Sequence, residues 1–266
     1  MPITCQQTLK PLSREEFGRL SYDLMADVLA IRKELGRFFD EKHYKQALAI
    51  RRQDVILETP VCVSHQTFSK TYFLDALFAE GAIIEFKTAE ALTRRHKAQL
   101  LHYQMLMDLE HGLLINVRPE RVAKEFVNCA LRCQDRLDFR ISATDWNEGV
   151  PGGDHFRSVL TELLQDWGTA LDLSLYEEAL THFLGGDSRV LHAVKVRLNG
   201  AVLGQQMFRF AADRVAFKLT AFDSMDSQQR FAHHARAMVN HTDLDALLWA
   251  NLGRREITFC CLKQEG

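Results

Sequence analysis

The sequence predicts a mixed α/β fold in which helices flank a sheet. In the first half of the chain, two helical patterns are followed by three strand patterns, a further helix and then more strands. The turn signal Glu80-Gly81 separates two apolar-rich strands, the second of which alternates clearly, and this predicts a β-hairpin. A similar order of elements recurs in the second half, which predicts an internal duplication.

The first helix is expected to begin after an irregular lead-in over residues 1–12. Ser13 and Glu16 have the spacing of a capping box, and apolar residues then recur at helical spacing as far as Leu35. Gly36 is the predicted stop of this helix. A second helix is expected over about 39–51.

The hairpin is expected within a group of strands. A strand over 55–63 contains Pro60, which favours a place at the edge of a sheet. The hairpin follows over about 71–87, and an amphipathic helix is expected over 90–107. The last elements of the first half are expected to be a buried strand and a further strand, over 112–117 and 121–127.

The second half is expected to be a domain of its own, with domains over 1–135 and 136–266. A connection with one strand, 137–142, precedes it. A hairpin ending near 220, a helix over 226–240 and two final strands then repeat the earlier order. The paired anchors are Gly36 and Gly168, Tyr44 and Tyr176, and Asn116 and Asn251.

Composition describes an ordinary globular chain. It has 266 residues, of which 47% are apolar and 26% charged, and its net charge is −2. Because neither half carries a strong basic excess, any contact with nucleic acid must come from a local patch. The six cysteines show no Cys-x-x-Cys pair and are expected to be structural thiols rather than zinc ligands. No signal peptide or membrane-length apolar run is present, so we expect a cytoplasmic protein with no membrane partner.

Candidate chemistry lies on the hairpin. Glu85 and Lys87 share one face of the second strand, and Asp75 lies on the first strand among apolar residues. Two crowded carboxylates repel each other, and a divalent cation with oxygen ligands would remove that cost. The alternative is a solvated charged face on an edge strand.

The surroundings of the hairpin resemble the GxxExxY family, a bacterial branch of the PD-(D/E)XK nuclease superfamily. The resemblance runs over roughly residues 13–127, and one departure is Phe38, where the family has the glycine of its name. The motifs that carry it are Asp75, Glu85-x-Lys87, His96 to Tyr103 with Gln99, Gly112 to Asn116, Glu34-Leu-Gly36, and Glu41 with Tyr44.

This resemblance implies a restriction-endonuclease-like mixed sheet flanked by helices, and a metal-dependent nuclease with DNA as the favoured substrate. The implied ligands of Mg²⁺ or Mn²⁺ are Glu41, Asp75 and Glu85. Lys87 would orient water or neutralise charge in the transition state, and Gln99 would position Lys87 or the phosphate. The alternative function is a non-catalytic nucleic-acid-binding or protein-interaction module that keeps the fold, and a homo-oligomer is left open.

The second copy is expected to lack the acidic site. The anchors place Glu41 on Leu173, Asp75 near Phe208, Glu85 on Lys218, Lys87 on Thr220 and Gln99 near His234. Scaffold positions persist while the proposed chemical positions are lost, which predicts a degenerate second copy.

Histidines form two further groups. The pair His96 and His102 shares a basic helix with Arg94, Arg95 and Lys97, and could line a phosphate path or a solvated face. The second group, His233, His234 and His241, is expected at the surface because no carboxylate or cysteine stands in register with it.

Overall fold

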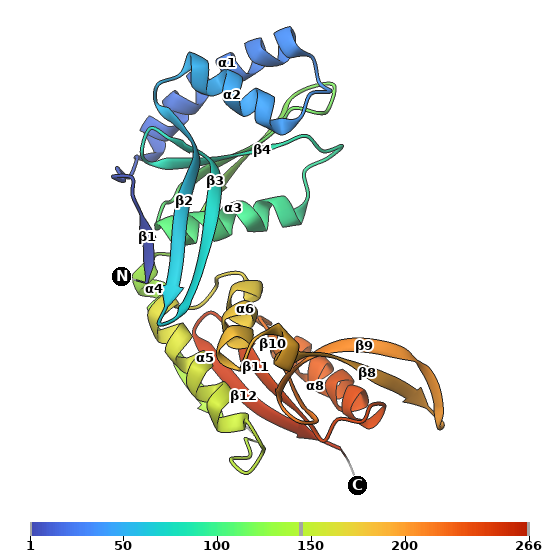
Figure 1. Ribbon diagram of the computed structural model, residues 1–266. Coiled ribbons are helices and arrows are strands. Elements are labelled where there is room, and N and C mark those ends of the chain that lie inside the picture. Colours follow the sequence, from blue (N-terminus) through green and yellow to red (C-terminus); the bar gives the residue numbers. More distant parts are fainter. Residues whose placement is uncertain (1, 144–145, 265–266) are drawn as a thin grey trace. The chain divides into compact units, whose positions relative to one another are not determined.

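The chain folds into two compact units, Met1–Cys133 and Gln134–Gly266. The computed structural model describes residues 2–143 and 146–264, and Figure 1 shows its ribbon. Each unit contains one six-stranded mixed sheet with helices packed on it. The mixed α/β class predicted from the sequence is therefore confirmed, and the architecture is compatible with a restriction-endonuclease-like fold.

The first unit has the strand order β1-β2-β3-β4-β5-β6, in which β4 and β5 run parallel and the other neighbours antiparallel. Its elements are β1 (Ile3–Cys5), α1 (Arg14–Leu35), α2 (Glu41–Arg51), β2 (Val55–His65), β3 (Phe68–Phe78), β4 (Ala82–Lys87), α3 (Arg94–Met107), β5 (His111–Asn116) and β6 (Ala123–Asn128).

The predicted start and stop of α1 are confirmed. Ser13 and Glu16 form the reciprocal capping box, which satisfies backbone N–H groups that have no partner inside the helix. Gly36 ends the helix with φ at 75°, a left-handed value that glycine adopts at little cost. The helix thus ends where the sequence predicts.

The predicted hairpin is also confirmed, as β3 and β4. Its turn contains Gly81, whose position a side chain could not share: a Cβ there would lie 2.1 Å from the carbonyl oxygen of Lys10. The N–H of Lys10 in turn donates to the carbonyl of Glu80. The lead-in segment, residues 1–12, therefore packs so closely on the turn that only glycine fits at position 81.

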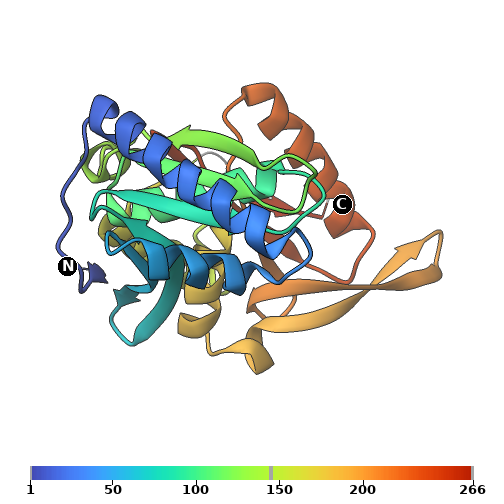
Figure 2. The ribbon, with the colours of Figure 1, turned by 90° about the horizontal axis from the view of Figure 1, so that it is seen from above.

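The two faces of β4 have different surroundings. Ile84 and Phe86 belong to the apolar core that α1 and α2 build on one face of the sheet, and Figure 2 shows these helices lying across the strands. The alternation along the strand turns Glu85 and Lys87 to the opposite face, where α3 packs. The apolar core thus fixes the strand that carries the polar pair.

Three details differ from the sequence predictions. The strand with Pro60 is at the edge of the sheet over only part of its length: β1 pairs with its far end, Val61–Val63, while in the described part of the chain the segment with Pro60 has β3 as its neighbour on one side and an open edge on the other. That short strand β1 lies in the lead-in expected to be irregular. The third helix begins at Arg94 rather than at 90, because Thr93 caps it through a box with His96.

The second unit has the order β7-β12-β11-β10-β9-β8, with parallel pairs β10/β11 and β12/β7. Its elements are α4 (Cys133–Leu137, which begins at the last residue of the first unit), β7 (Arg140–Ala143), α5 (Gly153–Trp167), α6 (Leu173–Phe183), α7 (Asp187–Val190), β8 (Leu191–Leu198), β9 (Ala201–Ala212), β10 (Val215–Thr220), α8 (Met225–Asn240), β11 (Ala246–Leu252) and β12 (Glu256–Lys263).

The two units share local details as well as the order of five strands, β2 to β6 and β8 to β12, whereas β1 and β7 join this order at opposite ends. The Tyr44 hydroxyl donates to the Gly36 carbonyl, and the Tyr176 hydroxyl donates to the Gly168 carbonyl, each across eight residues. Gly168 ends α5 with φ at 78°, close to the value at Gly36. The same hydrogen bond therefore connects α1 to α2 in the first unit and α5 to α6 in the second.

Several smaller predictions concern the surface and the thiols. His233, His234 and His241 are exposed, as predicted. All six cysteines are free thiols. None of the helices in the described ranges has both the length and the apolar character needed to cross a membrane.

The tyrosine–glycine contacts allow a paired stability test. Tyr44→Phe and Tyr176→Phe should each destabilise their own unit by about 1–2 kcal/mol, because a helix-terminal carbonyl loses its donor in a buried place. Thermal denaturation with probes in each unit would measure this. Tyr22→Phe is the control, because Tyr22 is 77% exposed, and a loss as large in the control would contradict the interpretation.

Candidate active site

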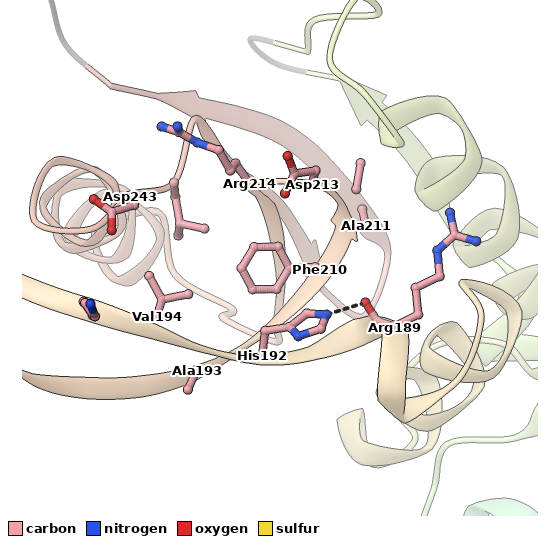
Figure 3. Close-up of a pocket in the computed structure, with 12 residues that line it drawn as sticks. Arg189, His192, Ala193, Val194, Phe210, Ala211, Asp213, Arg214 and Asp243 are labelled. Atoms are coloured by element: carbon pink, nitrogen blue, oxygen red, sulfur yellow. Dashed lines mark hydrogen bonds between the residues drawn. The ribbon is translucent and has the colours of Figure 1, made fainter.

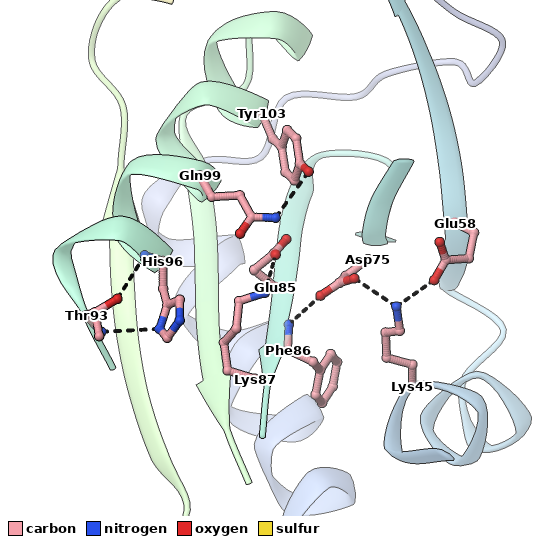
Figure 4. A network of polar contacts seen from close by, with 10 residues as sticks. All are labelled: Lys45, Glu58, Asp75, Glu85, Phe86, Lys87, Thr93, His96, Gln99 and Tyr103. Carbon is pink, nitrogen blue, oxygen red and sulfur yellow. Dashed lines mark hydrogen bonds and ion pairs between the residues drawn. The ribbon is translucent and has the colours of Figure 1, made fainter. Parts of the chain in front are cut away.

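The candidate site lies where β3 and β4 separate. Their pairing ends at Ala76 opposite Ile84, and beyond it a side chain replaces the backbone ladder. Asp75 Oδ2 accepts a hydrogen bond of 2.9 Å from the backbone N–H of Phe86. The carboxylate of Asp75 therefore lies beside the strand that carries Glu85, as Figure 4 shows.

Glu85 is the most buried acid of the site, with 1% of its surface exposed. One carboxylate oxygen, Oε1, pairs with Lys87 Nζ at 2.6 Å. The other, Oε2, is buried and has no hydrogen-bond partner in the described residues. Burial, the larger cause, and the charge of Asp75 together raise the pKa of Glu85 to about 7, although Lys87 opposes the shift.

Lys45 is a member of the site that was not predicted. This buried lysine extends from α2, and its Nζ lies 2.8 Å from Asp75 Oδ1 and 2.5 Å from Glu58 Oε1. Burial alone would lower its pKa, but the hydrogen bonds to Asp75 and Glu58 outweigh burial and raise the pKa above the ordinary lysine value. Lys45 is therefore a fixed positive charge at Asp75.

Glu41 is the first residue of α2 and is half-buried. Burial raises the pKa of this carboxyl group, and the negative charge of Asp75 raises it further, while Lys87 lowers it. Since Asp75 and Lys87 both act on its pKa, Glu41 belongs to the same electrostatic cluster as the hairpin residues.

Gln99 lies on α3 and faces the strand pair (Figure 4). Its side-chain amide donates to the Tyr103 hydroxyl at 3.2 Å, and its expected role of positioning Lys87 or the phosphate stays a prediction. Burial raises the pKa of Tyr103, and the negative charge of Glu85 adds to this. Gln99 and Tyr103 therefore form a polar pair that borders Glu85.

The two histidines of α3 have different places. His96 closes the capping box with Thr93 at the start of the helix. His102 is buried and packs against Tyr72, with ring centroids 5.0 Å apart. Neither a phosphate path nor a solvated face therefore describes His102, because it lies on the side of the helix that packs on β3.

The donor set has the chemistry that a hard divalent ion requires. Within the described residues, Glu85 has a buried oxygen without a hydrogen-bond partner. The pKa values of Glu41 and Glu85 are raised, first by burial and then by the negative charge of Asp75, and a bound cation would offset both effects. Across the described ranges, however, no group of three or more His, Cys, Asp or Glu side chains converges on a common point for an ion. In this arrangement Lys45 and Lys87 balance the charge of the acids.

Sequence reasoning missed Lys45 and Glu58 for different reasons. Lys45 follows Glu41 by four residues on one helix, so its place on the same face could have been found from spacing. Glu58 comes close only through the register of β2 on β3, in which Leu57 faces Ala76 and Thr59 faces Leu74. That register depends on a turn which the sequence does not mark strongly.

The corresponding place in the second unit carries a different set of charges. The Glu177 carboxylate on α6 forms ion pairs with Arg209 Nη1 at 3.3 Å and with Lys218 Nζ at 3.8 Å. Leu173 is the first residue of α6, as Glu41 is of α2. Thr220 pairs with Asn251 as Lys87 pairs with Asn116. This place holds one acid and two bases.

The second unit also has an open cavity of about 700 Å³. Figure 3 shows the ring of Phe210 in its wall, beside His192, whose Nε2 donates to the Arg189 carbonyl at 2.8 Å. Arg214 at its rim is paired with Asp245. None of the residues predicted for the active site lines this cavity.

Comparisons with known proteins found a solved structure and a family model that match parts of this chain. A solved structure described as the crystal structure of SSO0001 is 21% identical, with a TM-score of 0.30, over 43% of this chain. The chain spans 58% of the length of that protein. No curated protein matches this sequence.

A family model gives the more specific result. Residues 18–128 match the PD-(D/E)XK nuclease superfamily. The match is to the superfamily as a whole, so membership of the GxxExxY branch stays a prediction. The matched residues include Glu41, Asp75, Glu85, Lys87 and Gln99, so the part of the chain that carries the candidate site is similar to a superfamily of nucleases.

Proposed function

We propose that the first unit is a metal-dependent nuclease that hydrolyses phosphodiester bonds of nucleic acid, with DNA as the favoured substrate. The observation that carries this proposal is Glu85: a buried carboxylate with an oxygen free of hydrogen bonds, beside a second carboxylate and a lysine. Such an arrangement costs stability and is typical of a functional site. It lies within the residues that match the nuclease superfamily.

Each residue of the site has a proposed role. Glu41, Asp75 and Glu85 would hold Mg²⁺ or Mn²⁺, which when bound lowers the pKa of a coordinated water and offsets charge on the phosphate. Lys87, whose Nζ lies at Glu85, would neutralise charge that develops on the phosphate. Gln99 would position the phosphate from the side of α3.

We further propose that the second unit is a degenerate copy of the first. The shared strand pairings and the tyrosine–glycine contacts support a common origin. Charge is reversed at two positions of the site, because Glu177 stands where the first unit has Lys45, and Lys218 where it has Glu85. At three other charged positions of the site the second unit carries uncharged residues: Leu173, Phe208 and Thr220. A set with one acid and two bases would repel a divalent cation.

A non-catalytic nucleic-acid-binding module is the second candidate. The observation that favours it is that Asp75 already uses both oxygens, one with Lys45 and one with the Phe86 N–H. Metal binding distinguishes the two candidates, because only the nuclease requires it.

The first prediction from this proposal concerns cleavage. Glu85→Gln should abolish Mn²⁺-dependent cleavage while leaving the fold intact, because the carboxylate is lost but its volume is kept. A plasmid assay with supercoiled DNA would measure this, and one centre per chain should give nicked circles before linear product. Lys218→Ala is the matched control on β10 and should retain cleavage. Cleavage that survives Glu85→Gln but is lost in Lys218→Ala would assign the working centre to the other unit.

A second prediction follows from the raised pKa of Glu85. Its folded-state pKa is about 7, against an ordinary value of 4.5. Between these values the folded state keeps a proton that the unfolded state releases, so stability falls as pH rises through this window and stays lower above it. In metal-free buffer, Glu85→Gln should therefore be more stable than the wild type at pH 8 by on the order of 2 kcal/mol.

The same pair of proteins should differ little at pH 3.5, which lies below both pKa values, so that Glu85 is largely protonated in both states. Chemical denaturation at the two pH values would measure the difference. An equal effect of the substitution at both values would show that Glu85 does not titrate as proposed.

A third prediction concerns the contact with DNA. If lysines and arginines near the hairpin and α3 bind phosphates, the logarithm of the affinity should fall with the logarithm of salt, with a slope of roughly −0.9 for each neutralised phosphate. Fluorescence anisotropy with a duplex in Ca²⁺ buffer would measure it. A slope near zero would point to a protein partner instead.

A further inference from the structure

Asp75 forms an ion pair with Lys45 at a distance typical of a strong ion pair. Lys45 Nζ lies 2.8 Å from Oδ1, and the Lys45 side chain is 10% exposed. The remaining oxygen of Asp75 accepts from the Phe86 N–H. A cation that shares Asp75 with Glu85 would therefore approach a carboxylate that already pairs with Lys45, whose positive charge repels it.

Glu58 is a second carboxylate with which Lys45 forms an ion pair. Its carboxylate lies 2.5 Å from Lys45 Nζ on the side away from Asp75, and its side chain is 57% exposed (Figure 4). The backbone of Glu58 has φ at 50°, a left-handed value that is uncommon for a residue other than glycine. Glu58 lies within β2, between Leu57 and Thr59, which both pair with β3. In this backbone conformation its carboxylate lies at Lys45.

The second unit gives an independent comparison. The fifth residue of α2 is Lys45, and the fifth residue of α6, a helix of the same length, is Glu177. In the second unit, Lys218 stands at the position of Glu85 and Glu177 stands at the position of Lys45. Lys218 and Glu177 form an ion pair. The helix position thus carries the charge opposite to the strand position in both units.

We propose that Lys45 competes with the divalent ion for Asp75, and that it moves onto Glu58 when the ion binds. This inference rests on the proposed function, because it assumes that Asp75 is a metal ligand. It assigns Lys45 and Glu58 as positioning residues that set the metal concentration at which the site becomes loaded. In metal-free protein, Lys45 supplies the charge that keeps Asp75 stable beside Glu85.

Two substitutions should change metal affinity in opposite directions. Lys45→Gln removes the competitor and should tighten Mn²⁺ binding by about 10- to 100-fold, the range by which residues around a metal site alter affinity. Glu58→Gln removes the second carboxylate that pairs with Lys45 and should weaken binding by about tenfold. A purely structural role for the pair would not give effects of opposite sign.

The experiment is calorimetric titration of the full chain with Mn²⁺, and then with Mg²⁺, at pH 7.5. Lys42→Gln is the matched control, because Lys42 is an exposed lysine on the same helix, and its affinity should equal that of the wild type. Thermal melts provide a second measurement: without metal Lys45→Gln should melt below the wild type, because Asp75 loses its counter-ion, and Mn²⁺ should raise its Tm more.

The outcomes separate this inference from the proposed function. If the wild type binds metal and Lys45→Gln binds no more tightly, or Glu58→Gln binds no more weakly, Lys45 is not a competitor. If none of the four proteins binds metal, the nuclease proposal fails together with the inference. Should Lys45→Gln fail to fold, Glu58→Gln decides alone, since its side chain lies mostly in solvent.

Discussion

The first unit depends on how two carboxylates can be held next to each other in a partly buried place. Asp75 and Glu85 stand on adjoining strands where the backbone ladder has ended, so each must be stabilised by something other than water. The structure uses three donors for this: Lys45 and the Phe86 N–H at Asp75, and Lys87 at Glu85. One buried oxygen of Glu85 still has no hydrogen-bond partner in the described residues. Burying an acid in this way costs stability, and the cost points to a role beyond folding.

The apolar side of the sheet makes the arrangement rigid. Ile84 and Phe86 are fully enclosed beneath α1 and α2, and β5 runs in register along the other edge of β4, with Lys87 opposite Asn116. A shift of one residue along the strand would move Glu85 into the apolar core, so the register is strongly fixed. The carboxylate positions are therefore set by the apolar residues that alternate with them.

The sequence predicted the parts of the site that follow from local periodicity. Alternation placed Glu85 and Lys87 on one face, and the capping box of Ser13 and Glu16 fixed the start of α1. Lys45 and Glu58 were missed because their approach to Asp75 depends on how α2 packs and on the register of β2. Local sequence patterns indicate which face of a helix or strand a residue occupies and where a helix ends. Contacts between elements that are distant in the sequence depend on tertiary packing. For the same reason β1 was missed, since a three-residue strand owes its conformation to its partner.

The comparison of the two units separates what the fold requires from what the site requires. Tyr44 and Tyr176 make the same hydrogen bond, and Asn116 and Asn251 each accept a bond from the chain that follows the central strand. The charges differ: in the second unit Glu177 on α6 pairs with Lys218 on β10, whereas in the first unit Lys45 on α2 pairs with Asp75 and Glu58, and Glu85 pairs with Lys87. In the second unit the acid and the bases pair with one another, so a sheet with the same central strand pairings forms without the acids of the first unit. The acids of the first unit are therefore better explained by chemistry than by stability, and it is the charges around Asp75 and Glu85, rather than the shared scaffold, that distinguish the two units.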